Sequence, residues 1–317
     1  MKIVLTGSIA YDYLMHFPGR FQDNILPELL DRISLSFLVD SMARKRGGIA
    51  ANIAYTLALL GERPKILAAA GKDFPEYRDW LESKGVDTSA IHIFEDTYTS
   101  SFFATTDDAN AQIASFYPGA MDHSTKLSLK NLETKPDLVF ISPSDPAAMN
   151  KFIDECMELD IPYFYDPSQQ IVRFSPEELK HGILNCAALF SNEYEFGLIS
   201  DKTSLAKEDL MKSARFIVTT RGEDGIDITT SEEVIHVPSV SPDINYDPTG
   251  IGDAFRAGFL KGFLNDLSLE RCAQLGALAA TYCLESDSPQ GHEFNIPLFI
   301  DRFRKHYDDL GDFDSWL

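Results

Sequence analysis

Short apolar runs alternate with amphipathic segments along the whole of this 317-residue chain. A short apolar run fits a strand that is buried on both faces, and the segment between two runs has the spacing of a helix with one apolar side. The alternation predicts an α/β fold, with a three-layer α/β/α core and a mostly parallel central sheet. The expected strands are residues 2–9, 65–70, 138–142, 163–165, 188–191 and 216–220, and the expected helices include 49–60, 75–83, 147–159, 253–265, 269–285 and 297–310.

Two stretches break this alternation, residues 11–46 and 93–121. Within the second, SFFATTD and QIASFYP alternate on either side of the polar residues 107–110, which predicts a hairpin. A small β-sheet built from both insertions would lie apart from the core, as a lid that excludes water from a reaction does. The expected organisation is a core of residues 1–10, 47–92 and 122–317 and a lid of residues 11–46 and 93–121.

The charge is strongly negative, with 28 Lys and Arg against 49 Asp and Glu and a net charge of -21. Such a surface repels polyanions, so we expect neither nucleic acid nor an anionic membrane as a partner. A phosphate-bearing substrate would need a local group of donors to overcome the repulsion.

The spacing of the cysteines and the polarity of the first residues indicate where in the cell the protein is located. Cys156, Cys186, Cys272 and Cys283 lie far apart and show no zinc or redox spacing, which indicates buried free thiols. MKIVLTGSIAYD turns polar too early for a secretory signal, and no apolar run approaches about 18 residues. These features predict a cytoplasmic protein.

The segment DPTGIGDAFRAGFLKGFL, residues 247–264, carries the most chemical information. Gly250 and Gly252 precede an apolar helix, so backbone amides at the helix start can converge on an anion. Asp253 lies beside those amides and could accept a proton from a hydroxyl group. Taken alone, the same residues fit equally well a tight loop with a capping aspartate.

Two further segments each give weaker evidence for a ligand site when they are considered alone. RGGIAANIAYTLALLG, residues 46–61, again places glycines before a helix, with Asn52 on its first turns. GSIAYD places Asp12 just beyond the first strand, at the sheet edge where α/β proteins bind ligands. An isolated aspartate there more often belongs to an ordinary solvated turn.

Together these segments resemble the ribokinase-like, or PfkB, family of carbohydrate and nucleoside kinases over essentially the whole chain. GGIAAN is similar to the family's N-terminal signature, DPTGIGDAF to its C-terminal signature, and residues 192–195 to its N-x-x-E element. Within the family, GSIAYDYLMHFPGRF, SLSFLVD, AQIASFYPGAM, DPSQQ and SLERCAQLGALAA resemble bacterial adenosine kinases of the mycobacterial type.

The resemblance implies a role for each matching residue. Asp253 would be the catalytic base, with the amides of Gly250, Ile251 and Gly252 as its anion hole. Magnesium and the phosphates would be organised by Asn192 and Glu195, the metal through water. The remaining matches are Ser8, Asp12, Gly48 and Asn52 for the ribose and Thr220, Gly222 and Gly225 for the nucleotide.

The adenosine subgroup also implies a site for the base. Phe102 and Phe116 of the lid would flank the adenine ring, with Gln169, Gln170 and Arg173 at the matching edge of the core. Aromatic rings bind a purine by stacking, which a bare sugar cannot use. Without the resemblance, the two phenylalanines fit the lid's own core better.

The activity implied is transfer of the γ-phosphoryl group of ATP to the 5′-hydroxyl of adenosine, giving AMP and ADP in purine salvage. Asp247 matches a position near the potassium site of many relatives, so potassium stimulation is an open question, and pairing of lids in a homodimer is expected. The alternatives are a sugar kinase of the same fold and a nucleoside-binding protein without catalysis. A dinucleotide-dependent oxidoreductase is disfavoured because the first strand runs into GSIA, residues 7–10, rather than a G-x-G-x-x-G turn.

Overall fold

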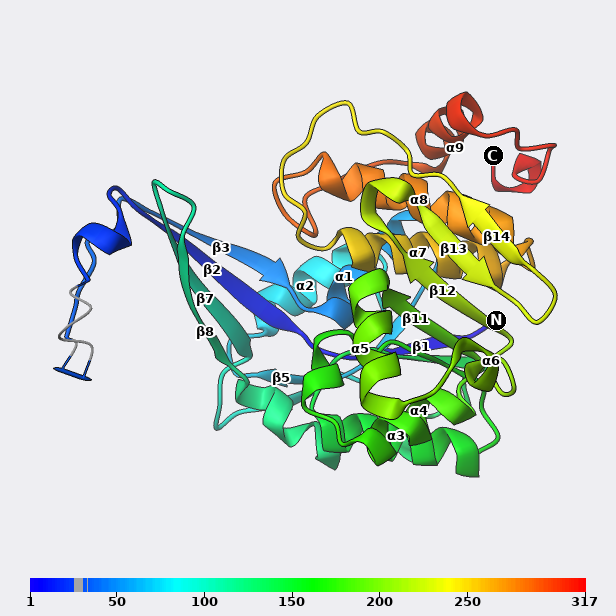
Figure 1. Ribbon diagram of the computed structural model, residues 1–317, viewed down its shortest axis with the longest axis horizontal. Helices are drawn as coiled ribbons and strands as arrows, with labels where there is room; N and C mark the ends of the chain where they lie inside the picture. Colours follow the sequence, from blue (N-terminus) through cyan, green and yellow to red (C-terminus); the bar gives the residue numbers. More distant parts are fainter. Residues whose placement is uncertain (26–30, 33) are drawn as a thin grey trace.

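The computed structural model describes residues 1–25, 31–32 and 34–317. Figure 1 shows a layered core, with a smaller sheet that projects from one end of it. The core has helices on both faces of a central sheet, which confirms the predicted three-layer α/β/α arrangement.

Among the described residues, the central sheet contains eight strands. Their spatial order is β14 (Val234–Val237), β13 (Ile226–Thr229), β12 (Phe216–Thr220), β11 (Ala188–Asn192), β10 (Tyr163–Tyr165), β9 (Leu138–Ile141), β1 (Ile3–Thr6) and β4 (Lys65–Leu67). The six strands from β12 to β4 are parallel to one another. β13 and β14 add an antiparallel hairpin at one edge, so the sheet is mostly parallel, as predicted.

The helices fall into two layers, which Figure 1 shows on opposite sides of the sheet. One layer contains α1 (Ile49–Leu59), α2 (Pro75–Ser83), α7 (Ile251–Leu264), α8 (Leu269–Leu284) and α9 (Ile296–His306). The other contains α3 (Pro146–Glu158), α4 (Pro176–Asn185), α5 (Glu193–Thr203) and α6 (Lys207–Leu210). Short 3-10 helices are η1 (Phe21–Asp23), η3 (Gly119–Lys126), η4 (Leu129–Asn131), η5 (Ser168–Val172), η6 (Gly222–Asp224) and η7 (Asp314–Trp316).

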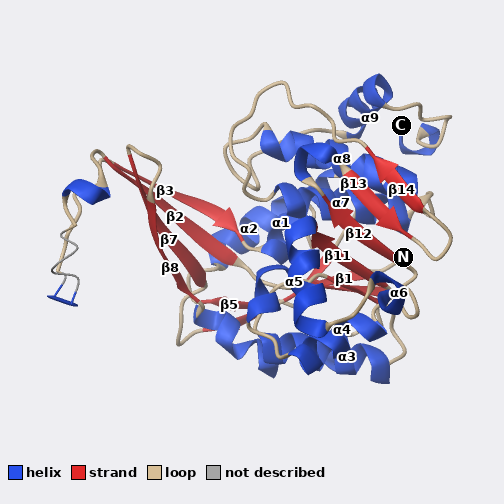
Figure 2. Cartoon of the chain, viewed as in Figure 1, coloured by secondary structure: helices blue, strands red, loops and turns tan. Residues whose placement is uncertain are grey.

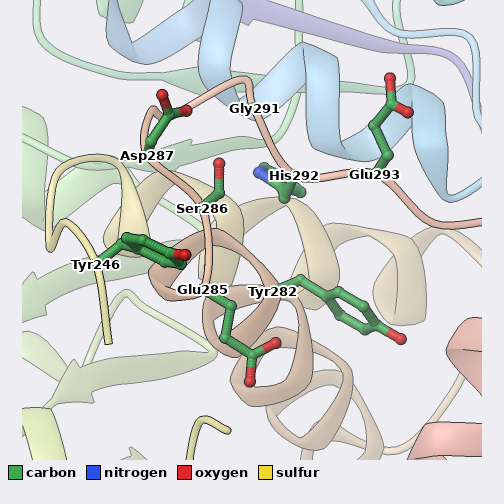
Figure 3. Close-up of a pocket in the computed structure, with 8 residues that line it drawn as sticks. All are labelled: Tyr246, Tyr282, Glu285, Ser286, Asp287, Gly291, His292 and Glu293. Atoms are coloured by element: carbon green, nitrogen blue, oxygen red, sulfur yellow. The ribbon is translucent and has the colours of Figure 1, made fainter. Parts of the chain in front are cut away.

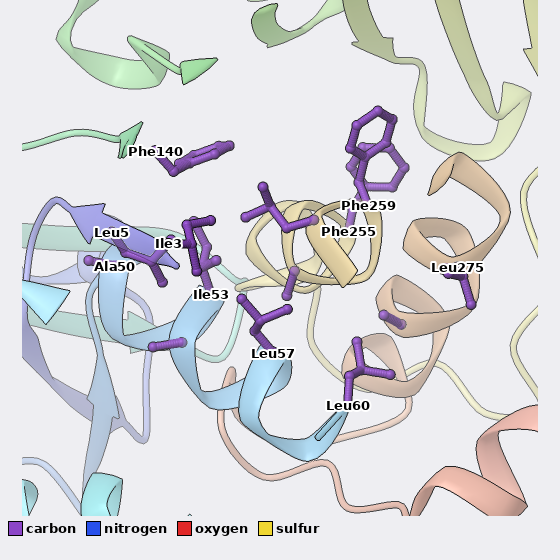
Figure 4. Packing of buried hydrophobic residues seen from close by; sticks show 14 of the residues in the cluster. Ile3, Leu5, Ala50, Ile53, Leu57, Leu60, Phe140, Phe255, Phe259 and Leu275 are labelled. Carbon is purple, nitrogen blue, oxygen red and sulfur yellow. The ribbon is translucent and has the colours of Figure 1, made fainter. Parts of the chain in front are cut away.

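Successive residues of one strand enter different cores. Ile3 and Leu5 of β1 pack with α1 and α7, whereas Val4 between them packs on the opposite face. Figure 4 shows the first of these cores, where side chains of α1 meet Phe255 and Phe259 of α7. Because both faces are covered, these strands are apolar without alternation, which is why the sequence shows them as continuous runs.

The projecting sheet is made by the two insertions. Its strands, in spatial order, are β3 (Ser41–Gly47), β2 (Ala10–Phe17), β7 (Ser100–Asp107) and β8 (Gln112–Tyr117). β7 and β8 form the predicted antiparallel hairpin, and Asp107 Oδ1 accepts hydrogen bonds from the turn amides of Ala109 and Ala111, 2.9 and 2.8 Å away. β2 and β7 run parallel, so the sheet is mixed, and Figure 2 shows it clear of the helical layers. Residues 26–30 and 33 of the expected lid lie outside the described residues.

The structure differs from the expectation at one strand. Residues 65–70, predicted as one strand, form β4 in the central sheet and β5 (Ala69–Gly71), which pairs with β6 (His92–Phe94) in a separate two-stranded sheet. At the end of β5, the backbone of Tyr98 and Thr99 lies against Gly71, closer than any Cβ would permit. The four cysteines are buried free thiols, as predicted.

Candidate active site

The predicted site residues gather at the carboxyl ends of the central strands. Asp12 lies on β2, which follows β1, while Asn192 ends β11 and Thr220 ends β12. Asn192 and Thr220 are direct neighbours in the register of β11 and β12. Parallel α/β sheets bind ligands along this edge, where helix N-termini also point.

The start of α7 presents free backbone donors. Gly250 precedes the helix in the left-handed region with φ 83°, and a Cβ there would lie 2.6 Å from Pro289, so only glycine fits. The amides of Gly250 and Gly252 donate to no described residue, and that of Ile251 lies a long 3.4 Å from the oxygen of Pro248. Together with the helix dipole, these amides can bind an anion.

Asp253 lies on the first turn of α7, and its Oδ2 accepts a hydrogen bond from Nδ2 of Asn52 on α1, 2.8 Å away. Burial raises the pKa of Asp253 to about 6. The nearby Arg256 and the Asn52 hydrogen bond act in the opposite direction, whereas Asp166 and Asp12 add to the rise in pKa. A carboxylate with this pKa is ionised at neutral pH and is still basic enough to accept a proton.

Asp12 is a second perturbed carboxylate close to Asp253. Burial raises the pKa of Asp12 to about 6, and repulsion from Asp247 adds to the rise. Gly47 lies beside it, where a Cβ would come within 2.6 Å of Asp12 Oδ2. The next residue, Gly48, has φ 94° and lies against the backbone of Ser8, whose Oγ accepts a hydrogen bond from the Ile49 amide at 3.1 Å. The close contact of these backbones holds Asp12 and the start of α1 together.

The projecting sheet places two aromatic rings on the same face as Asp12. Asp12 of β2 is opposite Phe102 of β7, and Phe102 is opposite Phe116 of β8. Side chains of residues paired in a sheet point to the same face, so the three residues form one row. Phe116 remains 51% exposed, which leaves its ring accessible to a ligand.

A cavity of about 720 Å³ lies next to the start of α7. It is lined by Thr220, Gly222 and Gly225, which were predicted for the nucleotide, and by Ile251 and Gly252 of the predicted anion hole. The rest of its wall includes Val240, Phe255, Ala277 and Leu284. A cavity of this size, apolar but with a few polar groups, is typical of a small-molecule site.

Asn192 and Glu195 form a capping box at the start of α5. The Asn192 side chain accepts from the Glu195 amide at 2.7 Å, and Glu195 Oε2 accepts from the Asn192 amide at 2.8 Å. Burial and the nearby Asp166 raise the pKa of Glu195. The sequence match to N-x-x-E therefore also has a structural role, since it begins a helix that was not among the predicted elements.

The site can hold magnesium through a single carboxylate, that of Glu195. In the part of the chain that the structure describes, no three His, Cys, Asp or Glu side chains converge as a metal site. Oε1 of Glu195 makes no hydrogen bond to a described residue. Because magnesium keeps most of its water and is often held by one carboxylate and the substrate phosphates, Glu195 fits such a site.

Of the residues predicted at the adenine edge, Gln169 and Gln170 lie on η5 and Arg173 follows it directly. Gln170 is buried and its Oε1 accepts from Arg173 at 3.3 Å, whereas Gln169 is exposed. Among the described residues, none of these three side chains hydrogen-bonds to the projecting sheet. The structure therefore does not join the two parts of the expected base site by direct bonds.

A buried ion pair beneath the site was not predicted. Arg256, one turn after Asp253, contacts Asp166 at the end of β10, and its Nη2 lies 3.4 Å from Ser168 Oγ. Asp166 is fully buried and Arg256 is 7% exposed. An arginine within the otherwise apolar stretch AFRAGFL could have indicated a buried partner, because cations are almost never fully buried unless they are paired.

A second hollow of about 440 Å³ lies near Asp247. Its lining residues, shown in Figure 3, are Tyr246, Tyr282, Glu285, Ser286, Asp287, Gly291, His292 and Glu293. Glu285 is paired with Arg302 through two contacts of 2.7 Å, and burial lowers the pKa of His292 to about 4. No residue predicted for the active site lines it. Asp247 itself accepts from the Thr249 amide at 2.8 Å.

A mostly parallel α/β core, a glycine-led helix bearing a half-buried carboxylate, and a separate small sheet together define the class of ribokinase-like proteins. The model of the pfkB family of carbohydrate kinases matches residues 8–293, so this chain belongs to that family. Membership implies ATP as a co-substrate.

Relatives and solved structures agree with this assignment. A nucleoside kinase of Methanocaldococcus jannaschii is 29% identical over 96% of this chain and 97% of the relative. A nucleoside kinase of Methanothermobacter thermautotrophicus is 30% identical over 93% of this chain and 92% of the relative. The structure of Burkholderia thailandensis nucleoside kinase in complex with inosine superposes with a TM-score of 0.86 and 31% identity, covering 96% of this chain and 98% of that one.

Among the described residues, no helix is both long enough and apolar enough to cross a membrane.

Proposed function

We propose that this protein is an adenosine kinase, which transfers the γ-phosphoryl group of ATP to the 5′-hydroxyl of adenosine and releases AMP and ADP. One observation carries the proposal. Asp253, held by Asn52, lies beside the free amides of Gly250 and Gly252, and Gly252 also lines the cavity that contains the predicted nucleotide loop. The proposed base and the proposed anion site thus adjoin a cavity large enough for a nucleotide.

In this proposal Oδ1 of Asp253 accepts the proton of the 5′-hydroxyl as that oxygen attacks the γ-phosphorus, and ADP leaves from the opposite side. The amides at the start of α7 hold the transferring group, since phosphoryl transfer depends mainly on positioning and charge stabilisation. Asp12 accepts hydrogen bonds from the ribose hydroxyls. Magnesium, held near Glu195 and Asn192 through water, would neutralise phosphate charge. We propose potassium near Asp247 as an activator, to be tested by titration of the rate.

The acceptor is proposed from the row of Asp12, Phe102 and Phe116. A carboxylate for the sugar and two rings for the base on one face of a sheet suit a nucleoside better than a free sugar. Relatives point to the same class, since matching proteins are named nucleoside kinase and cytidine kinase. Gln169, Gln170 and Arg173 are proposed to read the base edge when the sheet moves toward the core.

The test is ADP release by purified protein with ATP and magnesium, comparing adenosine, inosine, cytidine, ribose and fructose. Preference for adenosine supports the proposal in full. Faster turnover of inosine or cytidine keeps nucleoside phosphorylation and removes adenosine as the substrate. Turnover of ribose or fructose alone favours the sugar kinase alternative, for which a relative 26% identical, named ATP-dependent 6-phosphofructokinase, gives some support. No turnover with any acceptor favours a nucleoside-binding protein.

We also propose that the projecting sheet acts as a lid and pairs with a second copy of the chain. The face opposite Asp12 carries Tyr13 and Phe103, stacked at 4.8 Å, and the exposed Met42, Ile113 and Tyr117. An apolar face of this kind is typical of an interface. Light scattering should give a dimer mass that Phe103→Glu reduces, and a monomeric wild type would contradict the proposal. A cytoplasmic location is proposed on the four free cysteines.

A further inference from the structure

A chain of hydrogen bonds leads from α2 to the carboxylate of Asp253. Trp80 Nε1 on α2 donates to Gln290 Oε1 at 3.2 Å. Gln290, which lies between α8 and α9, donates from Nε2 to Asn52 Oδ1 at 2.9 Å, and Asn52 donates to Asp253 Oδ2 at 2.8 Å. Gln290 Nε2 also contacts the hydroxyl of Tyr77. The buried amide of Gln290 therefore joins α2 to α1, and Asn52 continues the connection to α7.

The direction of each bond in this chain is fixed by its two ends. An indole N–H can only donate, so the atom of Gln290 that faces Trp80 must be its oxygen. The amide nitrogen of Gln290 then faces Asn52 and Tyr77. At the other end, Tyr77 donates its hydroxyl proton to the Gly47 carbonyl, which can only accept, at 2.9 Å. The Tyr77 oxygen is therefore left to accept a hydrogen bond from Gln290 Nε2, which agrees with the orientation that Trp80 requires of the Gln290 amide.

This direction determines which side of the Asn52 amide reaches Asp253. Gln290 Nε2 is a donor, so it holds Asn52 Oδ1, and Asn52 Nδ2 must point at the carboxylate. Were the Asn52 amide reversed, its oxygen would face the carboxylate and its nitrogen would face another donor. Both contacts would be repulsive, and buried polar groups without partners are unfavourable.

We propose that Gln290, oriented by Trp80, is a positioning residue for phosphoryl transfer, because it locks the Asn52 amide so that Asp253 Oδ2 is bonded and Oδ1 is left for the acceptor hydroxyl. The inference rests on the proposed role of Asp253 as the base. Gln290 is 6% exposed and Asn52 5%, so solvent is a poor substitute for either bond.

The other charged and titratable groups around Asp253 do not belong to this series of hydrogen bonds. They are Arg256 on the same helix, Asp166 after β10, Asp12 on β2 and Cys283 on α8. Of the contacts that Asp253 makes with described residues, the hydrogen bond from Asn52 is the one whose donor is held by Gln290. That bond lowers the pKa of Asp253, so freeing the Asn52 amide should raise the pKa of the base.

The experiment measures the pH dependence of kcat/KM, whose acid limb reports the base of the free enzyme. Gln290→Met keeps the length of the side chain and removes its polar atoms, and Trp80→Phe removes the donor that orients Gln290. We expect the acid limb to move up by about 0.5–1 pH unit in the first variant and less in the second, with a loss of up to about tenfold at low pH that narrows at high pH. Gln274→Met, in a second buried glutamine that bonds to Arg271 and Glu270, should leave the profile unchanged.

A loss of activity that is equal at every pH, or an unchanged profile, would overturn the inference, because a structural role alone does not move the acid limb. Should Gln290→Met fail to fold, Trp80→Phe gives the test without adding a charge near Asp253. Carbon-13 NMR of the Asp253 carboxyl group, identified with Asp253→Asn, reads its titration without turnover. An inactive wild type would remove the proposed function, whereas an unshifted Asp253 titration in the variants would remove only the role of Gln290.

Discussion

Removal of the Arg256 guanidinium should be among the most destabilising single changes in this protein. Arg256 contacts the fully buried Asp166 and is itself 7% exposed, so Arg256→Met would leave a carboxylate buried without its cation. Breaking one side of a buried pair typically lowers the free energy of unfolding by about 3–5 kcal/mol. The remaining bond to Asp166, from Ser168 Oγ at 2.5 Å, is too little to replace a cation.

Urea unfolding followed by circular dichroism measures this loss at pH 8. The double variant Arg256→Met with Asp166→Asn should recover much of the stability, because it removes both charges. Arg304→Met is the matched control, since its pair with Asp309 lies at the surface and should matter far less. A loss below about 1 kcal/mol for Arg256→Met, or a double variant as unstable as the single, would refute the argument that this pair is buried and coupled.

Three further variants, Asp253→Asn, Phe116→Ala and Gly250→Ala, should each lose activity. Asp253→Asn should lower kcat by about 10²–10⁴-fold. It should also raise unfolding free energy by about 1–3 kcal/mol at pH 8. The pKa of about 6 means that the stabilising protonation of Asp253 is present below about pH 3.8 and is lost as the pH rises through 6, so this gain should vanish in acid, and a constant gain would contradict it. Phe116→Ala should raise the KM for adenosine about tenfold or more, as expected for one lost stacking contact. Phe103→Ala on the opposite face of the sheet should not, and equal effects in initial-rate assays would remove the base site. Gly250→Ala should abolish turnover, because a Cβ would lie 2.6 Å from Pro289 and φ is 83°, whereas near-normal turnover would show that the amides at this helix start are dispensable.

The layers of the core could be predicted because burial on both faces makes the strands continuous apolar runs. The helix at residues 75–83 was predicted with its observed bounds, and the hairpin around residues 107–110 was predicted because strict alternation indicates a half-exposed strand. The division of residues 65–70 between two sheets could not be foreseen, since β5 pairs with β6, which comes later in the chain. Local sequence determines periodicity, whereas the partner of a strand is a tertiary property.

The same distinction applies to the site. Asn52 and Asp253 belong to short segments with their own pattern of glycines, so both could be proposed as site residues before the structure was known. Their hydrogen bond across 201 residues and the buried partner Gln290 have no local pattern that predicts them. The apolar residues around Arg256 indicate a buried partner for it but do not identify that partner as Asp166. Gln290 and Arg256 each contact a buried polar group, and these groups come together only when α1, α2, α7 and the strand ends meet. Family signatures therefore suggest which groups to propose as substrate contacts, while the groups that affect their charge and orientation have to be found from packing.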